Sequence, residues 1–190
     1  WGNQENYGQL GLGDMIYRSS PVQVGSLTDW AFVQSDGSSG AAIKTDGTLW
    51  AWGSGSNGEL GDGSTVAKSS PVQVGALTTW EYADVGSQNV LATRTDGTAW
   101  TWGSNSNGQG GDGTTTDRSS PVQVGSLTDW DLISAGGAAN YAIKNDGTLW
   151  AWGSGSSGRL GDGSTVSKSS PIQVGSLTSW TEVTSTTRAG

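Results

Sequence analysis

Carboxylates are the side chains in this sequence whose recurrence could support catalysis. Two sets of aspartates repeat every 50 residues: Asp46, Asp96 and Asp146 in the motif "DGT", and Asp62, Asp112 and Asp162 in the motif "GDG". Glycoside hydrolysis needs two carboxyl groups about 5–9.5 Å apart in unequal environments, whereas these sets consist of equivalent positions. An aspartate in a turn bonds its own backbone. We therefore expect turn aspartates and no catalytic residue.

Other reactive groups are missing or isolated. The sequence has no cysteine and no histidine, which removes thiolate and imidazole metal ligands, the cysteine nucleophile and the Ser-His-Asp arrangement. One aspartate per glycine-rich loop lacks the dense oxygen series of a calcium loop. We expect no metal, no cofactor and a protein that is not an enzyme.

Basic residues form a third recurring set, near the second aspartates: Arg18, Lys68, Arg118 and Lys168. Solvated charges paired with those aspartates are the expected arrangement, and anion binding is the alternative. A net charge of −8 with nine Lys and Arg argues against a nucleic-acid partner, because binding to phosphates needs clustered cations. No apolar stretch approaches the roughly 20 residues that span a bilayer, so membrane insertion is not expected.

Internal repetition is the main feature of the chain. Pro21, Pro71, Pro121 and Pro171 are spaced by 50, as are Trp30, Trp80, Trp130 and Trp180. Residues 46–80 and 146–180 match at 29 of 35 positions. A fixed period near 50 predicts supersecondary units that stack to bury their faces. Hydrophobic residues are only 33%, but each of the 11 tryptophans can bury about 150–250 Å².

Each unit is expected to contain four strands. Residues 41–53 predict a hairpin around Asp46-Gly47, with the type I′ turn that Asp-Gly favours. Short β-rich runs, Trp30–Gln34 and Pro71–Val74, stand before and after it, and the proline marks the start of an edge strand. Short connections make neighbours antiparallel, and several such sheets around an axis form a β-propeller. The predicted fold class is therefore all-β, a propeller of four-stranded antiparallel blades.

The third strand of each unit is apolar on both faces. Trp50 and Trp52 share one face while Leu49 and Ala51 take the other. This is what a blade between two blades requires, so we expect the tryptophan pairs to pack between neighbouring units. A tryptophan box that binds a ligand is the alternative.

Motifs of this kind resemble a known family. "DGTLWAWGSGSNGELGDG" (46–63), "DGTAWTWGSNSNGQGGDG" (96–113) and residues 1–14, each followed by a Ser-Ser-Pro-Val-Gln-Val segment, resemble the regulator of chromosome condensation repeats. The resemblance implies a propeller, usually of seven blades. Where family repeats often carry a histidine, this chain has Ser39, Asn89 and Ala139, so nucleotide-exchange activity is not implied. The low charge is similar to bacterial and phage members, including a secreted β-lactamase inhibitory protein.

The repeats divide the chain into one array over residues 1–190. Full blades are expected at 30–74, 80–124 and 130–174, with partial units at 1–29 and 175–190. The chain would begin at the end of a third strand and close on a first strand, Trp180–Thr184. A longer parent chain or self-association that completes the ring is the favoured interpretation, and closure of four narrow blades or an open arc are the alternatives.

Variation between units gathers on one rim, which we call the top face. It comprises the turns between the first two strands and the long loops between the last two, where Gln9, Glu59, Gln109 and Arg159 share one position. Loops on a rigid scaffold commonly carry function, although unrestrained drift would also produce variation. The first loop is the most apolar and offers an anchor. The predicted partner-binding residues are Tyr7, Met15, Tyr17, Asp36, Glu59, Gln88, Asn89, Gln109, Asn140 and Arg159.

These observations favour a non-catalytic module that binds a macromolecule, a protein or a surface glycan, through its top loops. An extracellular, cell-surface or virion location in a bacterial or phage protein is expected, with a cytoplasmic one left open. Two alternatives remain: a structural array that assembles with copies of itself as a spacer or coat, and a secreted inhibitor of an enzyme.

Overall fold

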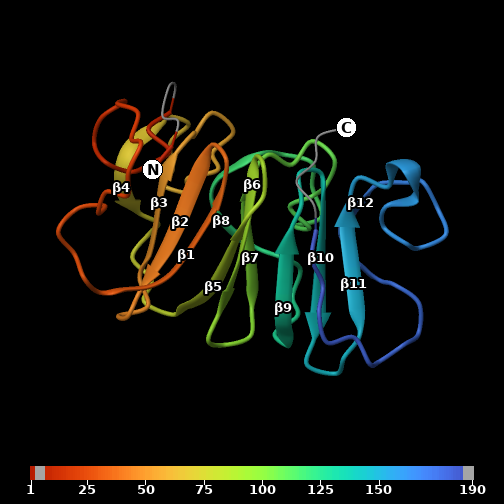
Figure 1. The fold of residues 1–190 in the computed structure, drawn as a ribbon. Coiled ribbons are helices and arrows are strands. Elements are labelled where there is room, and N and C mark those ends of the chain that lie inside the picture. The colour runs from red at the N-terminus through yellow and green to blue at the C-terminus, as the bar shows by residue number, and fades with distance from the viewer. Residues whose placement is uncertain (3–6, 186–190) are drawn as a thin grey trace.

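Three four-stranded antiparallel sheets stand side by side in the computed structural model (Figure 1), which describes residues 1–2 and 7–185. Parts of the two predicted partial units lie outside the described residues: 3–6 in the first and 186–190 in the second. The first sheet contains β1 (Trp30–Asp36), β2 (Ser39–Lys44), β3 (Leu49–Gly53) and β4 (Lys68–Gln73). The second contains β5 (Trp80–Val85), β6 (Asn89–Arg94), β7 (Ala99–Gly103) and β8 (Arg118–Gln123). The third contains β9 (Trp130–Ala135), β10 (Ala139–Lys144), β11 (Leu149–Gly153) and β12 (Lys168–Gln173).

Within each sheet, the strands pair with their neighbours in chain order. A short 3₁₀ turn, η1 (Ser156–Gly158), lies in the top loop of the third sheet. The predicted fold class, four-stranded antiparallel blades, is confirmed. Within the described part of the chain, no helix has the length and apolar character needed to cross a membrane.

The tight turn between β2 and β3 differs from the predicted type I′ turn. Gly47 has a positive φ of 76°, whereas Asp46 does not. The Gly47 amide donates to the carbonyl of Lys44 at 2.9 Å, and the Lys44 amide donates to Thr48 at 3.0 Å. This is a type I turn followed by a left-handed glycine bulge, the usual three-residue hairpin. This turn needs a positive φ only at its glycine, so Asp46 keeps a negative φ.

Two strands are longer than predicted. β1 extends to Asp36 instead of Gln34 and shortens the turn into β2. β4 begins at Lys68, so Pro71 lies inside the strand and not at its start. An edge strand tolerates this because the missing N–H faces away from the ladder.

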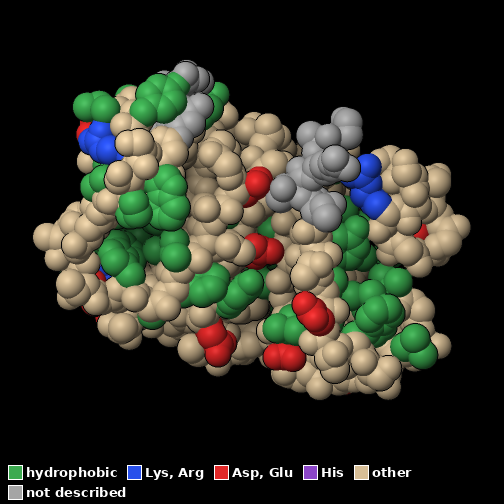
Figure 2. All heavy atoms as spheres, viewed as in Figure 1, with side chains coloured by type: hydrophobic (Ala, Val, Ile, Leu, Met, Phe, Trp, Pro, Cys, Tyr) green, Lys and Arg blue, Asp and Glu red, His purple; other side chains and the backbone are tan. Residues whose placement is uncertain are grey.

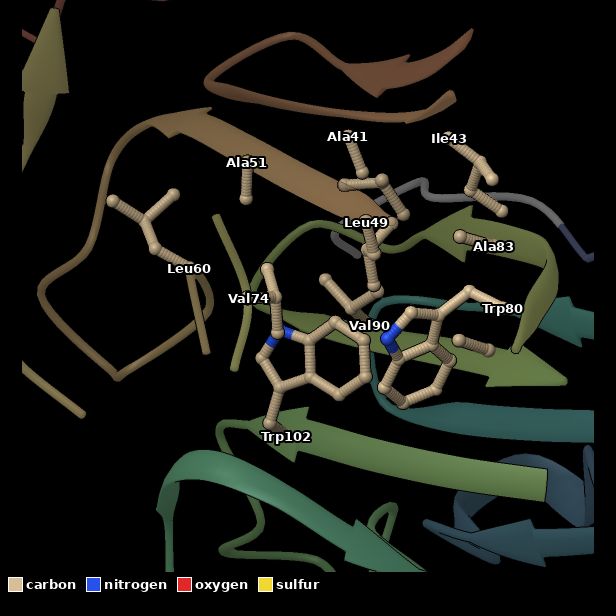
Figure 3. Close-up of a cluster of buried hydrophobic side chains, with 12 residues drawn as sticks. Ala41, Ile43, Leu49, Ala51, Leu60, Val74, Trp80, Ala83, Val90 and Trp102 are labelled. Atoms are coloured by element: carbon tan, nitrogen blue, oxygen red, sulfur yellow. The ribbon is translucent and has the colours of Figure 1, made fainter. Parts of the chain in front are cut away.

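Apolar side chains fill the space between adjacent blades (Figure 3). Leu49, Leu60 and Val74 of the first blade meet Trp80 and Trp102 of the second, and all five are buried. An equivalent cluster joins the second blade to the third through Trp130 and Trp152. The expectation that tryptophans pack between neighbouring units is therefore confirmed at both interfaces.

Hydrogen bonds also join each blade to the loop that precedes it in the array. Trp52 Nε1 donates to the carbonyl of Gln9 at 3.0 Å, Trp102 Nε1 donates to Glu59 at 2.9 Å, and Trp152 Nε1 donates to Gln109 at 2.8 Å. The last two bonds are buried. A buried indole N–H needs such a partner, so this residue fixes the top loop of the preceding blade.

The first tryptophan of each pair lies at the underside. Trp50 Nε1 donates to the Thr48 hydroxyl at 3.0 Å, and that hydroxyl donates to Asp46 at 2.6 Å. The hydroxyl bond is the main cause that lowers the pKa of Asp46. A carboxyl group that acts as a general acid needs a raised pKa. The pKa of Asp46 is lowered instead, and its carboxylate stabilises the turn by accepting these hydrogen bonds. Lys44 lies 4.6 Å from the centre of the Trp50 ring and covers it.

The predicted final strand, Trp180–Thr184, does not form in the described residues. The segment nevertheless lies where the inner strand of a following blade would lie. Its Trp180 amide donates to Gly147 at 3.1 Å, as the Trp130 amide donates to Gly97 at 3.2 Å. In the part of the chain that the structure describes, no further strand pairs with this segment, so no ladder defines it as a strand.

Candidate functional site

The top loops of the second and third blades enclose a hollow of about 1020 Å³. We call it the top hollow. Hydroxyl and amide groups dominate its lining, with Gln88 and Asn107 from the second blade and Ser154 and Ser156 from the third. Tyr141 and Arg159 of the third blade also line it, together with Thr184 and Ser185 from the segment that follows this blade. Its volume is at the upper end of the range of ligand pockets.

Four predicted partner-binding residues are buried: Glu59, Asn89, Gln109 and Asn140. These side chains are therefore not exposed to solvent as expected, although Gln109 lines the top hollow. Their contact with a partner stays a prediction. Each of the four makes hydrogen bonds inside the array.

Glu59 and Gln109 fold back onto their own loops. Glu59 accepts the Asn57 amide at 2.7 Å and the Ser54 hydroxyl at 2.7 Å. Gln109 accepts the Asn107 amide at 2.9 Å. Both side chains present a carboxyl or amide oxygen at the same place, so the change of charge between units leaves the loop bond intact.

Asn140 connects the second and third blades. Its Nδ2 donates to the carbonyl of Gln109 at 2.6 Å, and its Oδ1 accepts the Gly136 amide at 2.9 Å. Asn89 Nδ2 donates to the same oxygen at 3.2 Å. These hydrogen bonds satisfy the buried side-chain amides in place of water. Asn89 and Asn140 therefore stabilise the buried layer beneath the top loops.

The other six predicted residues keep access to solvent. Tyr7, Met15 and Tyr17 are exposed in the first loop, far along the chain from the top hollow. Asp36 is half-buried at the end of β1. Gln88 and Arg159 are exposed, and both line the hollow. Of these six residues, the structure places Gln88 and Arg159 together at the top hollow.

Sequence reasoning missed Tyr141. Ala41 and Leu91 stand at the same position of the other repeats, so the sequence signal was an aromatic residue that replaces small or aliphatic ones. The Tyr141 hydroxyl donates to the carbonyl of Arg159 at 2.8 Å. That carbonyl corresponds to the acceptors of Trp102 and Trp152. Burial raises the pKa of Tyr141, while Arg159 opposes the rise, so the hydroxyl remains a donor at neutral pH.

The predicted pairing between basic residues and the second aspartate set is confirmed. Lys68 lies 3.4 Å from Asp62, and Arg118 lies 2.7 Å from Asp112. The third pair, Lys168 and Asp162, is 3.7 Å apart. Within the described residues, no group of three or more acidic side chains could hold a metal ion.

The second top loop carries a compensating pair of residues. Asn105 is buried and its amide donates to Asp112 at 3.2 Å and to the carbonyl of Thr116 at 3.1 Å, while its Oδ1 accepts the Gly110 amide at 2.7 Å. The other two full repeats have Gly55 and Gly155 here, and buried Leu60 and Leu160 at the position of Gly110. The buried side chain of Asn105 thus occupies the interior of this loop, where leucine occupies it in the first and third blades.

We expect Asn105→Gly to lower the free energy of unfolding by about 2–3 kcal/mol, because several buried polar groups lose their partner. Adding Gly110→Leu should recover most of this loss, since it recreates the pairing of the other loops. Chemical denaturation of the two variants measures both effects. A double variant as unstable as the single one would contradict the compensation.

The fold defines a class of protein, a β-propeller repeat array built of four-stranded antiparallel blades. The chain belongs to the regulator of chromosome condensation (RCC1) repeat family, whose sequence pattern matches residues 46–93, 96–143 and 146–186. Comparison with the curated proteins gives no match.

Solved structures share the arrangement of the blades. Human WBSCR16 is 24% identical with a TM-score of 0.81, over 94% of this chain and 48% of that protein. Yeast RCC1 (Prp20), solved bound to Kap60, is 18% identical with a TM-score of 0.80, over 93% of this chain and 44% of that one. Prp20p from Saccharomyces cerevisiae, described with its binding to Gsp1p and histones, gives 18% and 0.74, over 93% and 45%. The chain thus spans less than half of each, and these likenesses establish the fold.

Proposed function

We propose that this chain is a non-catalytic protein-binding module whose partner contacts the top loops of the second and third blades. The observation that carries the proposal is the top hollow, where loops that differ between repeats meet on a rigid stack. A similar propeller binds proteins: yeast RCC1 (Prp20) is solved with Kap60 and is described with its binding to Gsp1p and histones. A cell-surface or particle-surface location belongs to the same proposal.

The composition of the hollow supports a protein partner. Tyrosine and arginine are enriched in binding hot spots, while serine and asparagine provide adaptable hydrogen bonds in antibody paratopes. The hollow has one tyrosine, one arginine and a majority of small polar groups. Its loops are carried by paired strands, which hold them in place before a partner arrives.

Site-specific photocrosslinking tests the assigned face. A benzoylphenylalanine at Gln88 reports on the top hollow, and one at Asn145 reports on the underside; both side chains are exposed. After irradiation in an extract of the producing organism, we expect a discrete adduct from position 88 and none from position 145. Adducts from position 145 alone, or equally from both, would assign the partner to another surface.

Self-association is a second candidate function, favoured by one observation. Trp180 is 39% exposed, whereas its equivalents Trp80 and Trp130 are 3% and 4% exposed. A blade beyond the third would cover it. Native mass spectrometry from low to high micromolar concentration tests this candidate. Oligomers that Trp180→Ser abolishes would support it, and a monomer throughout would exclude it.

A further inference from the structure

We propose that the outer edge of every blade is closed to strand addition, so that neither a partner nor a second copy of the chain extends the sheets there. The outer strands β4, β8 and β12 are edge strands, each paired on one side only. An exposed edge strand offers unpaired N–H and C=O groups to any extended segment, and recognition by strand addition uses these groups. The inference stands apart from the proposed function, which concerns the loops of the top face.

Charge gives these edges little protection. Natural edge strands are often guarded by charged side chains, lysine above all, but only 14% of the residues in this chain are charged. Figure 2 shows basic and acidic side chains in scattered places on the face that it displays. The basic residue of each outer strand lies at its first position and is paired with an aspartate: Lys68, Arg118 and Lys168. Other features must therefore close the edge.

The long loop of the preceding blade covers the first half of each outer strand. The Gly63 amide donates to the carbonyl of Ser119 in β8 at 2.8 Å, and the Gly113 amide donates to that of Ser169 in β12 at 2.8 Å. An equivalent bond from the first long loop reaches β4 at 2.7 Å. A carbonyl that is already bonded, with a loop lying against it, is shielded from an added strand.

Proline and an irregular backbone close the second half. Each outer strand has a proline at its fourth position: Pro71, Pro121 and Pro171. Proline has no N–H to offer to an added strand. The pairing is also irregular here, because Lys68 pairs with Gly53 whereas Val72 pairs with Ala51. Three residues of β4 thus lie opposite one residue of β3, and such a bulge bends an edge away from a flat partner.

Replacing the prolines by valine restores the missing donors and tests the inference. In the triple variant Pro71→Val, Pro121→Val and Pro171→Val, each outer strand gains an N–H at its free edge. We expect this variant to self-associate about tenfold more tightly than the wild-type chain, because two edges that pair gain one or two net hydrogen bonds. Sedimentation velocity at matched concentrations measures the association, and the wild-type chain gives the baseline for any association through Trp180.

The serine before each proline supplies the matched control, because it is exposed in all three blades: Ser70, Ser120 and Ser170. Valine at these three positions adds apolar surface without a new donor and should leave association at the wild-type level. Two results would overturn the inference: a proline triple variant that associates no more than the wild-type chain, or a serine triple variant that associates as strongly as the proline variant.

Hydrogen exchange of the wild-type chain tests the loop cover without any substitution, and it decides the matter if the proline variant loses its sheets. Gly63, Gly113 and Gly125 are all exposed, so exposure alone predicts equal rates. Within the described residues, only the amides of Gly63 and Gly113 among these three bond the next blade. We expect these two amides to exchange about tenfold or more slowly than that of Gly125. Equal rates would show that the loops do not cover the edges.

Discussion

Replacing Trp102 by alanine is expected to lower the free energy of unfolding by about 3–5 kcal/mol, the range for a fully buried aromatic side chain. Trp102 is 1% exposed and packs against Trp80, with ring centres 5.9 Å apart. Its Nε1 bond to Glu59 contributes about 1 kcal/mol of this. Trp102→Phe should therefore destabilise the chain less than Trp102→Ala, because an aromatic ring remains.

Trp1→Ala is the matched control, since Trp1 is 72% exposed and its removal should have almost no effect. Denaturation followed by far-ultraviolet circular dichroism compares the three variants without relying on indole fluorescence. In a repeat array, stability is a sum over blades and interfaces, so Trp102→Ala should also separate the unfolding of the first blade from the rest. Equal stability of Trp102→Ala and Trp1→Ala would show that the interface does not hold the array.

Gly97→Ala should be the second most damaging of these changes, at about 3 kcal/mol, because left-handed backbone geometry and a steric overlap add together. Gly97 has a φ of 75° in the turn between β6 and β7, and a methyl group there would overlap the carbonyl oxygen of Thr128. That oxygen belongs to the connection into the third blade, so the whole underside would have to move.

Gly125→Ala separates the two causes. Gly125 has a similar φ of 58°, but no atom lies within 4 Å of an added methyl group. We expect a loss of about 1 kcal/mol from backbone strain alone. Thermal unfolding of both variants provides the comparison. Similar losses for the two would mean that the underside yields to the methyl group and that the overlap has no cost.

Residue spacing was sufficient to predict the architecture. The period of 50 placed four strands in each unit, and alternation along Leu49–Trp52 predicted apolar faces on both sides, which the interfaces show. Turn type was not predictable from Asp46-Gly47, because this pair is compatible both with a two-residue type I′ loop and with a three-residue loop that starts one residue earlier and needs a positive φ only at the glycine. Hydrogen bonding of Lys44 to Thr48 decides between them.

The candidate site was harder to predict. A change from Glu59 to Gln109 and Arg159 was interpreted as exposure, but Glu and Gln share the oxygen that caps the loop, and only Arg159 lacks it. Burial of the first two depends on a neighbouring blade, which local sequence does not encode. Tyr141 was missed because its role depends on the carbonyl of Arg159, 18 residues away.

Hydrogen exchange of the indole N–H groups tests most directly that the blades are held by tryptophans packed between them and bonded to the preceding loop. One sample labelled with ¹⁵N-tryptophan, assigned with single Trp→Phe variants, resolves every ring. The account predicts slow exchange for Nε1–H of Trp102 and Trp152 and rapid exchange for that of Trp1. Exchange of Trp102 and Trp152 as fast as that of Trp1 would contradict it.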